Sequence, residues 1–291
     1  MIVVTGATGQ LGRAIVQKLV ERVPASRIAA SVRDPQKAAD LLALGVRVRR
    51  GDFADPASLA EAFEGATQVL VVSSNAAAVG GDPLAQHRSA IDAARTAGAR
   101  RIVYTSHLAA SATSAFAPAR DHAVTEEMLR ESGVAWTALR NGFYAASALM
   151  LMGEAPKTGV IEAPTDGKVS WTTHGDLAEA AAIILADEGR FDGPTPALTA
   201  SKALDLSDLA AIASEFRAEP VRRFILPDAD LRAKMVARGV PMRGADIVLG
   251  LYLASRNGEF AFVDPTLEQL LGRQPIPMRD VIAETFVPQQ L

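Results

Sequence analysis

The sequence contains no cysteine, so disulfide bonds, thiolate catalysis and cysteine-ligated metal sites are excluded. An excess of one charge is also missing, because Lys and Arg are scattered along the chain and the formal net charge is −3. A strongly basic surface is what binds a polyanion. We therefore do not expect a nucleic acid as a partner.

Metal-ligand patterns are equally scarce. The four histidines show neither an i, i+4 pair nor an H-E-x-x-H motif, the spacings that bring two imidazoles to one metal ion. They are His87, His107, His122 and His174. We expect no metal site.

Long hydrophobic runs are absent too. The apolar stretches, such as residues 180–186, are too short and too charged at their edges to span a bilayer. The first residues lack the basic region, apolar stretch and small-residue cleavage site of a secretory signal. We therefore expect a cytoplasmic protein with no membrane partner.

The composition is that of an ordinary globular protein, with 49% hydrophobic and 22% charged residues. A chain of 291 residues can form one large α/β domain, with or without a smaller lobe. Short apolar runs alternate with helical patterns along the first half. The expected strands cover residues 2–4, 27–32, 46–50, 68–72, 101–105 and 134–139. The expected helices between them cover residues 11–20, 36–44, 57–63 and 87–97.

Strands that are continuous hydrophobic runs need helices on both faces of their sheet. We therefore predict a doubly wound, parallel, Rossmann-type α/β sheet with a smaller C-terminal α/β lobe. The regular pattern loosens after about residue 145, where turn residues become frequent. The predicted domains are residues 1–145, the Rossmann domain, and residues 146–291. The second segment is expected to return a helix, at about residues 176–186, to the Rossmann domain and to form the substrate lobe.

The most specific motif reads T-G-A-T-G-Q-L-G and lies between the first strand and the first helix. In such a turn Gly6 permits a tight exit from the strand, Gly9 lets the backbone approach a pyrophosphate, and Gly12 lets the helix pack closely. The helix N-terminus adds N–H donors and the positive end of the helix dipole. We predict a dinucleotide site rather than a glycine-rich turn without a ligand. The residues expected there are Gly6, Ala7, Thr8, Gly9, Gln10, Leu11 and Gly12.

The residue after the second strand selects between the two dinucleotides, because a carboxylate holds the ribose diol of NAD and a cation holds the 2′-phosphate of NADP. That residue is Arg33. A guanidinium pairs bidentately with phosphate oxygens. Asp34 follows directly and is expected to cap the next helix, with Pro35 at its first position. We therefore predict NADPH as the cofactor, against the alternative that Arg33 is a solvated surface arginine.

Polar residues follow three further strands, at the carboxyl edge where open α/β sheets bind ligands. Asp52 and Phe53 are expected beside the adenine, although Asp52 also suits a loop-starting turn. The groups expected along the path of the ribose and nicotinamide are Ser73, Ser74, Asn75, Thr105 and Ser106. Each one singly also suits an ordinary turn.

The motifs together resemble the NmrA-like group of atypical short-chain dehydrogenases, and within it the bacterial NADPH-dependent quinone oxidoreductase 2 type. The N-terminal motif is shared by a whole superfamily, whereas the segment L-R-N-G-F-Y is narrower. The resemblance extends along nearly the whole chain. Its matching stretches are residues 5–12, 32–35, 104–106, 139–144, 167–168 and 270–275.

Most short-chain dehydrogenases protonate a carbonyl with a Tyr-x-x-x-Lys pair, and this sequence has His122 to Glu126 where that pair is expected. Ketone reduction is therefore disfavoured. The resemblance implies hydride reduction of a quinone, an acceptor that hydrogen-bond donors or water can protonate afterwards. The candidate catalytic donors are Asn141, Tyr144, His122 and His107, and the candidate substrate contacts are Asn141, Phe143 and Tyr144. Packing of the lobe is the alternative role of the two aromatic residues.

Two other functions stay open. Some NmrA-like proteins are non-catalytic redox sensors that bind a dinucleotide, and the missing Tyr-Lys pair suits that role as well. Reductases of triphenylmethane or azo dyes resemble this group and accept hydride on a similarly conjugated carbon. The sequence also leaves open whether the chain forms a homodimer.

Overall fold

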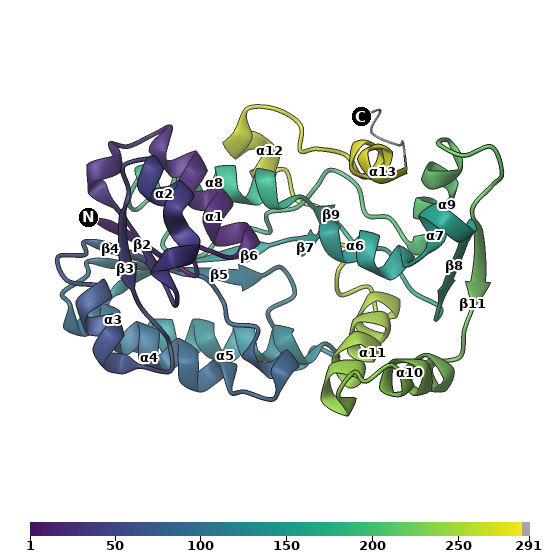
Figure 1. Cartoon of the computed structure of the whole chain (residues 1–291), viewed down its shortest axis with the longest axis horizontal. Helices are drawn as coiled ribbons and strands as arrows, with labels where there is room; N and C mark the ends of the chain where they lie inside the picture. The colour runs from purple at the N-terminus through teal and green to yellow at the C-terminus, as the bar shows by residue number, and fades with distance from the viewer. Residues whose placement is uncertain (287–291) are drawn as a thin grey trace.

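The computed structural model describes residues 1–286 and is built around a seven-stranded sheet in the order β10-β6-β5-β4-β1-β2-β3. All neighbouring strands of this sheet pair in parallel (Figure 1). The predicted Rossmann-type α/β class is therefore confirmed. The strands are β1 (Ile2–Thr5), β2 (Ile28–Val32), β3 (Arg47–Arg50), β4 (Gln68–Val71), β5 (Arg101–His107), β6 (Ala135–Asn141) and β10 (Gly193–Pro194).

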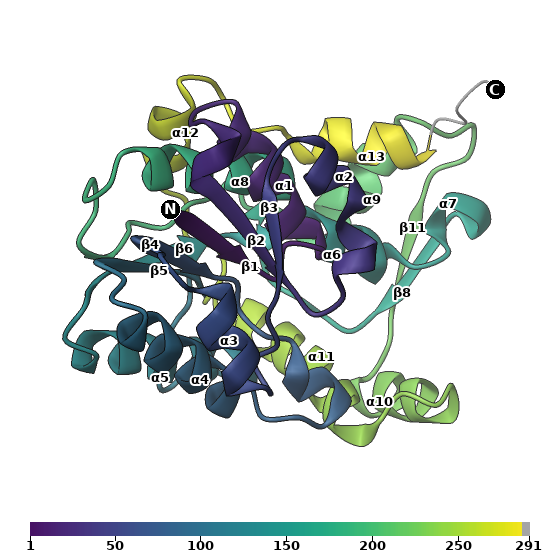
Figure 2. The same ribbon diagram turned by 60° about the vertical axis from the view of Figure 1, so that its left-hand side comes forward.

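Helices cover both faces of the sheet, as continuous apolar strands require. Figure 2 shows α1, α2, α8 and α12 on one side of the sheet and α3, α4 and α5 on the other. Their bounds are α1 (Gln10–Val20), α2 (Ala39–Ala43), α3 (Pro56–Ala62), α4 (Pro83–Thr96), α5 (Ala117–Glu131), α8 (His174–Ala186) and α12 (Thr266–Leu271). Three short 3₁₀ helices are η1 (Ala25–Arg27), η2 (Pro35–Ala38) and η3 (Ala76–Val79).

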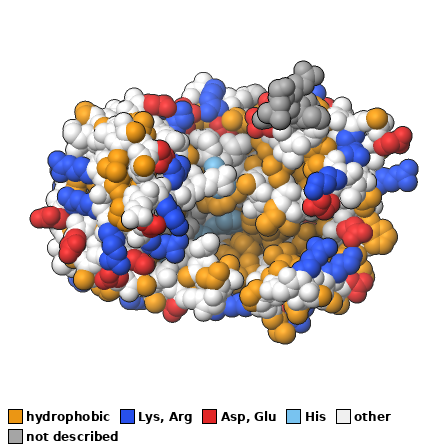
Figure 3. Space-filling model, in the orientation of Figure 1, with side chains coloured by type: hydrophobic (Ala, Val, Ile, Leu, Met, Phe, Trp, Pro, Cys, Tyr) orange, Lys and Arg blue, Asp and Glu red, His pale blue; other side chains and the backbone are white. Residues whose placement is uncertain are grey.

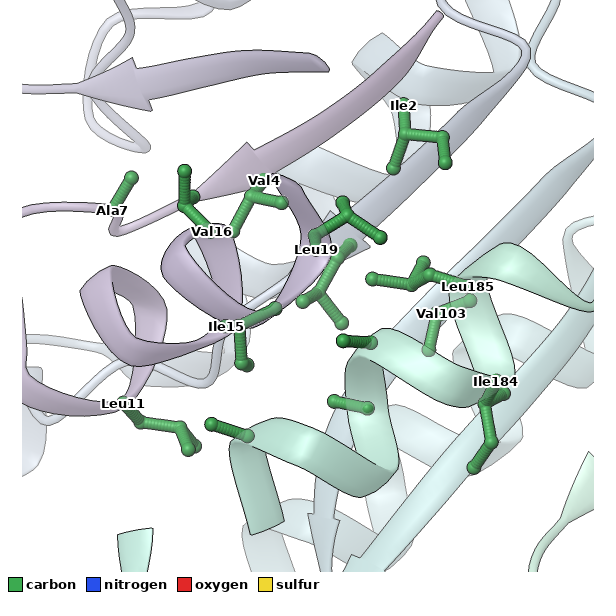
Figure 4. Close-up of a cluster of buried hydrophobic side chains, with 14 of the residues drawn as sticks. Ile2, Val4, Ala7, Leu11, Ile15, Val16, Leu19, Val103, Ile184 and Leu185 are labelled. Atoms are coloured by element: carbon green, nitrogen blue, oxygen red, sulfur yellow. The ribbon is translucent and has the colours of Figure 1, made fainter. Parts of the chain in front are cut away.

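The core on the first face lies between α1, α8 and the sheet (Figure 4). Ile15 and Leu19 of α1 meet Leu185 of α8, and all three are at most 1% exposed. Each such side chain contributes on the order of 1.5–3 kcal/mol when it is buried. This packing joins two helices that lie more than 150 positions apart, and it holds α1 rigidly over the end of β1.

Several predicted boundaries shift, and each shift has a local cause. Helix α4 starts at Pro83 rather than residue 87, because the Asp82 carboxylate accepts from the N–H groups of Leu84 and Ala85. Helix α5 was not anticipated. The segment predicted as one helix over residues 36–44 is divided between η2 and α2.

The remaining elements gather beyond the carboxyl edge of the sheet, on the right in Figure 1. They bury their own hydrophobic cluster, whose members include Trp171, Tyr252, Phe260 and Ile282. The elements are β7 (Phe143–Tyr144), α6 (Ala145–Met152), α7 (Ala155–Thr158), β8 (Val160–Ala163), β9 (Trp171–Thr172), α9 (Leu206–Ser214), β11 (Arg222–Ile225), α10 (Asp228–Ala237), α11 (Met242–Arg256) and α13 (Met278–Phe286). The division at residue 145 stays a prediction, and the last five residues of its second segment, 287–291, lie outside the described residues.

Candidate functional site: a dinucleotide cleft and a histidine-rich pocket

The turn between β1 and α1 has the backbone geometry of a phosphate cradle. Gly6 adopts a φ of +58°, a left-handed conformation that glycine enters without strain. The Gly9 N–H donates to the Gly6 carbonyl at 2.9 Å. A Cβ on Gly12 would lie 2.4 Å from that same carbonyl oxygen, so the third glycine permits α1 to pack against the turn. Gly6 is therefore required by its backbone conformation, and Gly12 by the close approach of α1 to the turn.

The N-terminus of α1 is left without a side-chain cap. Gly9 occupies the N-cap position, and the first turn carries no acidic residue. Asp55, Asp82 and Asp205 cap α3, α4 and α9 with their carboxylates. The first N–H groups of a helix lack intrahelical partners and carry its positive dipole end. The start of α1 is therefore free to bind an anion such as a pyrophosphate.

A cleft of about 520 Å³ opens over this turn at the carboxyl edge of the sheet. It brings together residues from seven segments of the chain. From the predicted set it is lined by Gly6, Thr8, Gly9, Gln10, Leu11, Gly12, Arg33, Asp52, Phe53, Ser73, Ser74, Asn75 and Tyr144. Ala7 is fully buried in the core instead, so only its backbone belongs to the turn.

Arg33 and Asp34 are neighbours in the sequence but have different surroundings. Arg33 is exposed, lines the cleft, and makes no hydrogen bond or ion pair within residues 1–286. The Asp34 side chain accepts from the Gln36 N–H at 3.1 Å and caps η2. The capping prediction for Asp34 is confirmed, which leaves the Arg33 guanidinium as the charged group at the end of β2.

Asp52 and Phe53 lie on the wall opposite the turn. Asp52 uses one carboxylate oxygen to accept from the Ala54 N–H at 3.0 Å, which is the turn role considered for it. Gly51 precedes them, and a Cβ there would meet the Ser31 hydroxyl oxygen at 2.2 Å. This close approach fixes the loop after β3 against β2.

The polar residues after β4 and β5 divide into cleft-lining and supporting groups. Ser73 lines the cleft, whereas Thr105 is 1% exposed. The Thr105 hydroxyl accepts from the Ser73 N–H at 2.8 Å and donates to its hydroxyl at 3.2 Å. Ser74 is held similarly, since its N–H donates to Nε2 of His87 at 2.9 Å. Thr105 therefore positions the wall and does not form it.

Ser106 is likewise placed away from the cleft. Its hydroxyl donates to the Glu126 carboxylate at 2.6 Å, and that carboxylate pairs with the Arg140 guanidinium at 2.7 Å. Ser106 is 3% exposed and Glu126 is 8% exposed. The ion pair raises the pKa of Arg140. These side chains connect α5 to β6. Glu126, at the position where a Tyr-x-x-x-Lys pair would have its lysine, therefore has a structural role.

Tyr144 and His174 close the far end of the cleft. Their rings lie 4.3 Å apart between centroids at an angle of 35°, and both residues line the cleft. Burial lowers the pKa of His174 and raises the pKa of Tyr144. Asn141 is 2% exposed, and its side chain partly offsets the shift of Tyr144. The structure thus places Asn141 behind Tyr144 instead of on the cleft wall.

His107, His122 and Phe143 meet in an aromatic cluster. The two imidazole rings stack at 5.9 Å and 19°, and Phe143 packs edge-on against His107 at 5.3 Å. Phe116 and Phe260 complete the surround of His107. Burial lowers the pKa of His107 to about 4 and holds the pKa of His122 well below its usual value. Both imidazoles are therefore neutral near pH 7.

Figure 3 shows histidine atoms in the hollow at the middle of the molecule, with hydrophobic side chains on its right-hand wall. A planar, conjugated molecule fits this combination of apolar walls and a few fixed donors.

Sequence reasoning missed several residues of this region. Among them are Gln86 and His174, which line the cleft, and Tyr104, which contacts His122. His174 follows the two-residue strand β9, whose pairing with β7 joins segments 28 residues apart, so no local pattern marks it. Tyr104 stands mid-strand, where an aromatic residue is ordinarily core.

Neither metal ligands nor membrane segments emerge from the described residues. Within residues 1–286, no three His, Asp or Glu side chains are grouped so that they could hold a metal ion. No helix in that range is long and apolar enough to cross a bilayer.

Comparison with known proteins identifies the family. The NAD(P)H-binding family matches residues 6–188. Quinone oxidoreductase 2 of Escherichia coli is 37% identical over 287 residues, which cover 98% of this chain and 99% of that protein. Its crystal structure, complexed with NADPH, superposes with a TM-score of 0.91 at 36% identity and covers 99% of this chain and 100% of that one.

Two further relatives widen the comparison. An NmrA-like family domain-containing oxidoreductase of Aspergillus flavus is 29% identical over 98% of this chain and 94% of that protein. Triphenylmethane reductase of Citrobacter sp., complexed with NADP(H), gives a TM-score of 0.88 at 32% identity over 99% of this chain and 100% of that one. This chain therefore belongs to the NAD(P)H-binding family, in the NmrA-like group of atypical short-chain dehydrogenases.

Proposed function

We propose that this protein is an NADPH-dependent reductase that transfers hydride to a quinone or a similarly conjugated acceptor. The observation that carries this proposal is the full-length likeness to an NADPH-dependent quinone oxidoreductase, together with a cleft that presents an uncapped helix N-terminus and a free Arg33. Bound NADPH supplies the hydride. The protein binds, orients and shields the reactants.

Different residues of the cleft would bind the charged phosphates and the uncharged rings of the cofactor. The N–H groups at the start of α1 would hold the pyrophosphate, and Arg33 would pair with the 2′-phosphate. Phe53 and Asp52, which line the cleft, would contact the adenine. Tyr144 and His174, whose tilted rings lie 4.3 Å apart between centroids, would stand at the nicotinamide end.

The absence of a Tyr-x-x-x-Lys pair suits an acceptor that needs no strong general acid. Glu126, at the position where the lysine of a Tyr-x-x-x-Lys pair is expected, is committed to Arg140 and Ser106. No lysine therefore lowers the pKa of a catalytic tyrosine, and ketone reduction lacks its usual acid. A quinone gains aromatic stabilisation as it is reduced, so a hydrogen bond to its oxygen is sufficient help.

Steady-state oxidation of NADPH, followed at 340 nm with 1,4-benzoquinone, tests the proposal. We expect turnover that depends on both reactants and is much weaker with NADH. Tight NADPH binding without turnover on any quinone would instead indicate the redox-sensor function.

A triphenylmethane dye is the second candidate acceptor, and the structural likeness to the Citrobacter reductase supports it. Decolourisation of malachite green under NADPH tests it directly. The partner is in either case a small molecule. A homodimer and a cytoplasmic location stay predictions.

A further inference from the structure

Two residues outside the cofactor cleft are joined by a short hydrogen bond. The Tyr104 hydroxyl on β5 lies 2.7 Å from Nδ1 of His122 on α5. Tyr104 is fully buried, whereas His122 is partly exposed. A phenol is a stronger acid than a neutral imidazole N–H, and an imidazole nitrogen is a better acceptor than a phenol oxygen. Tyr104 therefore donates, and its buried hydroxyl is satisfied.

This hydrogen bond fixes the tautomer of His122. With Nδ1 accepting, the neutral ring carries its proton on Nε2. Within residues 1–286, Nε2 of His122 makes no hydrogen bond and is not among the buried nitrogens that lack a partner. The ring therefore offers an open N–H donor on the side away from Tyr104.

His107 has the same tautomer for a different reason. The backbone N–H of Ala109 donates to its Nδ1 at 3.1 Å, so the proton again lies on Nε2. That nitrogen is buried without a partner in the described chain, and its ring stacks on His122. His107 forms the floor under His122 and restrains its ring against rotation.

The pair lies near the cleft-lining Tyr144. His107 ends β5 and is aligned with Asn141 of β6. Its ring contacts Phe143, the neighbour of the cleft-lining Tyr144. His122 is on the helix that normally carries the catalytic tyrosine of these enzymes, so its N–H takes up a donor position that the missing Tyr-x-x-x-Lys pair leaves open.

We propose that His122 donates its Nε2–H to the acceptor oxygen that gains negative charge, and that Tyr104 is the positioning residue that holds it in this tautomer. This inference rests on the proposed function. In this reaction the quinone would gain a hydride, that is one proton with two electrons, from bound NADPH, which becomes NADP⁺; the Nε2–H would stabilise the resulting oxyanion, and a proton from solvent would complete the hydroquinone. The imidazole stays neutral throughout.

A direct test is ¹⁵N NMR of the imidazoles in the protein without cofactor. We expect His122 as the Nε2–H tautomer, and we expect Tyr104→Phe to move its Nδ1 signal toward the position of a nitrogen without a hydrogen bond. Tyr252→Phe is the matched control, because Tyr252 is another tyrosine that is 2% exposed. An Nδ1–H tautomer in the wild type overturns this inference and leaves the proposed function intact.

Enzyme kinetics provide a second test of the donor role of His122. His122→Phe should lower kcat for 1,4-benzoquinone on the order of 100-fold, and Tyr104→Phe about 10-fold, while the Kd of NADPH is unchanged. Because Tyr104 acts through His122, adding Tyr104→Phe to His122→Phe should cost nothing further. Independent, additive effects contradict the proposal, as does a Tyr104→Phe rate equal to that of Tyr252→Phe.

Two outcomes remain to be separated. If Tyr104→Phe does not fold, His122→Gln, which keeps an N–H donor, should retain more activity than His122→Phe, and equal rates contradict the donor role. If the wild type shows the Nε2–H tautomer but reduces no quinone, the proposed function fails and the donor role fails with it.

Discussion

A Cβ atom on Gly12 would lie 2.4 Å from the carbonyl oxygen of Gly6, closer than any van der Waals contact allows. Gly12→Ala should therefore displace α1 from the turn, lower the free energy of unfolding by about 1–3 kcal/mol and abolish NADPH binding. Urea denaturation and fluorescence titration measure the two effects.

Gly9 is the contrasting position in the same turn. A Cβ there would lie 3.2 Å from the Gly6 oxygen and would otherwise face the cleft. Gly9→Val should abolish dinucleotide binding and leave the fold largely intact, because its side chain occupies the space of the pyrophosphate. Unchanged NADPH affinity in this variant would show that the dinucleotide lies elsewhere.

Arg33→Ala should weaken the binding of NADPH far more than that of NADH. The loss of a charge-assisted contact with the 2′-phosphate costs on the order of 1–3 kcal/mol, and NADH lacks that phosphate. Titration with both dinucleotides measures the difference. Lys37→Ala is the control, since Lys37 is an exposed cation nearby that does not line the cleft. Equal losses for the two dinucleotides would remove Arg33 from the site.

Tyr144→Phe and Asn141→Ala should lower kcat/KM for a quinone while the affinity for NADPH changes little. Tyr144 lines the cleft at the end proposed for the nicotinamide, and the neighbouring Asn141 is buried. We expect the larger effect in Tyr144→Phe, because Tyr144 lines the cleft and Asn141 does not. Wild-type turnover in both variants would assign these residues to packing alone.

His87 makes the stability of the fold depend on pH. It is 1% exposed, and burial lowers its pKa to about 4. The unfolded chain binds a proton near pH 6.5 that the folded His87 does not bind, so stability is full above that pH and falls as the pH drops toward 4. For one histidine this loss is about 3 kcal/mol.

Urea denaturation at pH 7 and pH 4.5 measures the loss. His87→Gln keeps a side-chain acceptor for the Ser74 N–H but cannot titrate, so it should lose less stability between the two pH values than the wild type. His107 and His122, whose pKa values burial also lowers, still contribute to the pH dependence of stability in this variant. An identical loss in both proteins would show that His87 does not titrate in this range.

The sequence by itself determined the dinucleotide turn, because its signals are local. The left-handed φ of Gly6 and the close packing of Gly12 are properties of eight consecutive residues. Asp34 likewise caps the helix that begins directly after it, which separates its role from that of Arg33.

Tertiary structure decided how deep each polar group lies. Thr105 and Ser106 end a strand at the carboxyl edge, as the sequence indicates, but packing buries both beneath the wall they were expected to form. Asn141 is buried behind Tyr144 in the same way. A sequence shows which strand carries a residue, whereas depth depends on helices and loops supplied from distant segments.

Tertiary structure alone decided which side chains from different elements contact each other. Tyr144 meets His174 only because β7 pairs with β9, and Tyr104 meets His122 only because α5 lies over β5. Neither contact leaves a periodic trace in the sequence, since each joins residues from different elements through side chains. The glycine turn proposed to bind the cofactor is thus a local property of the chain, whereas the side-chain contacts around His122 and His174 are a property of the folded molecule.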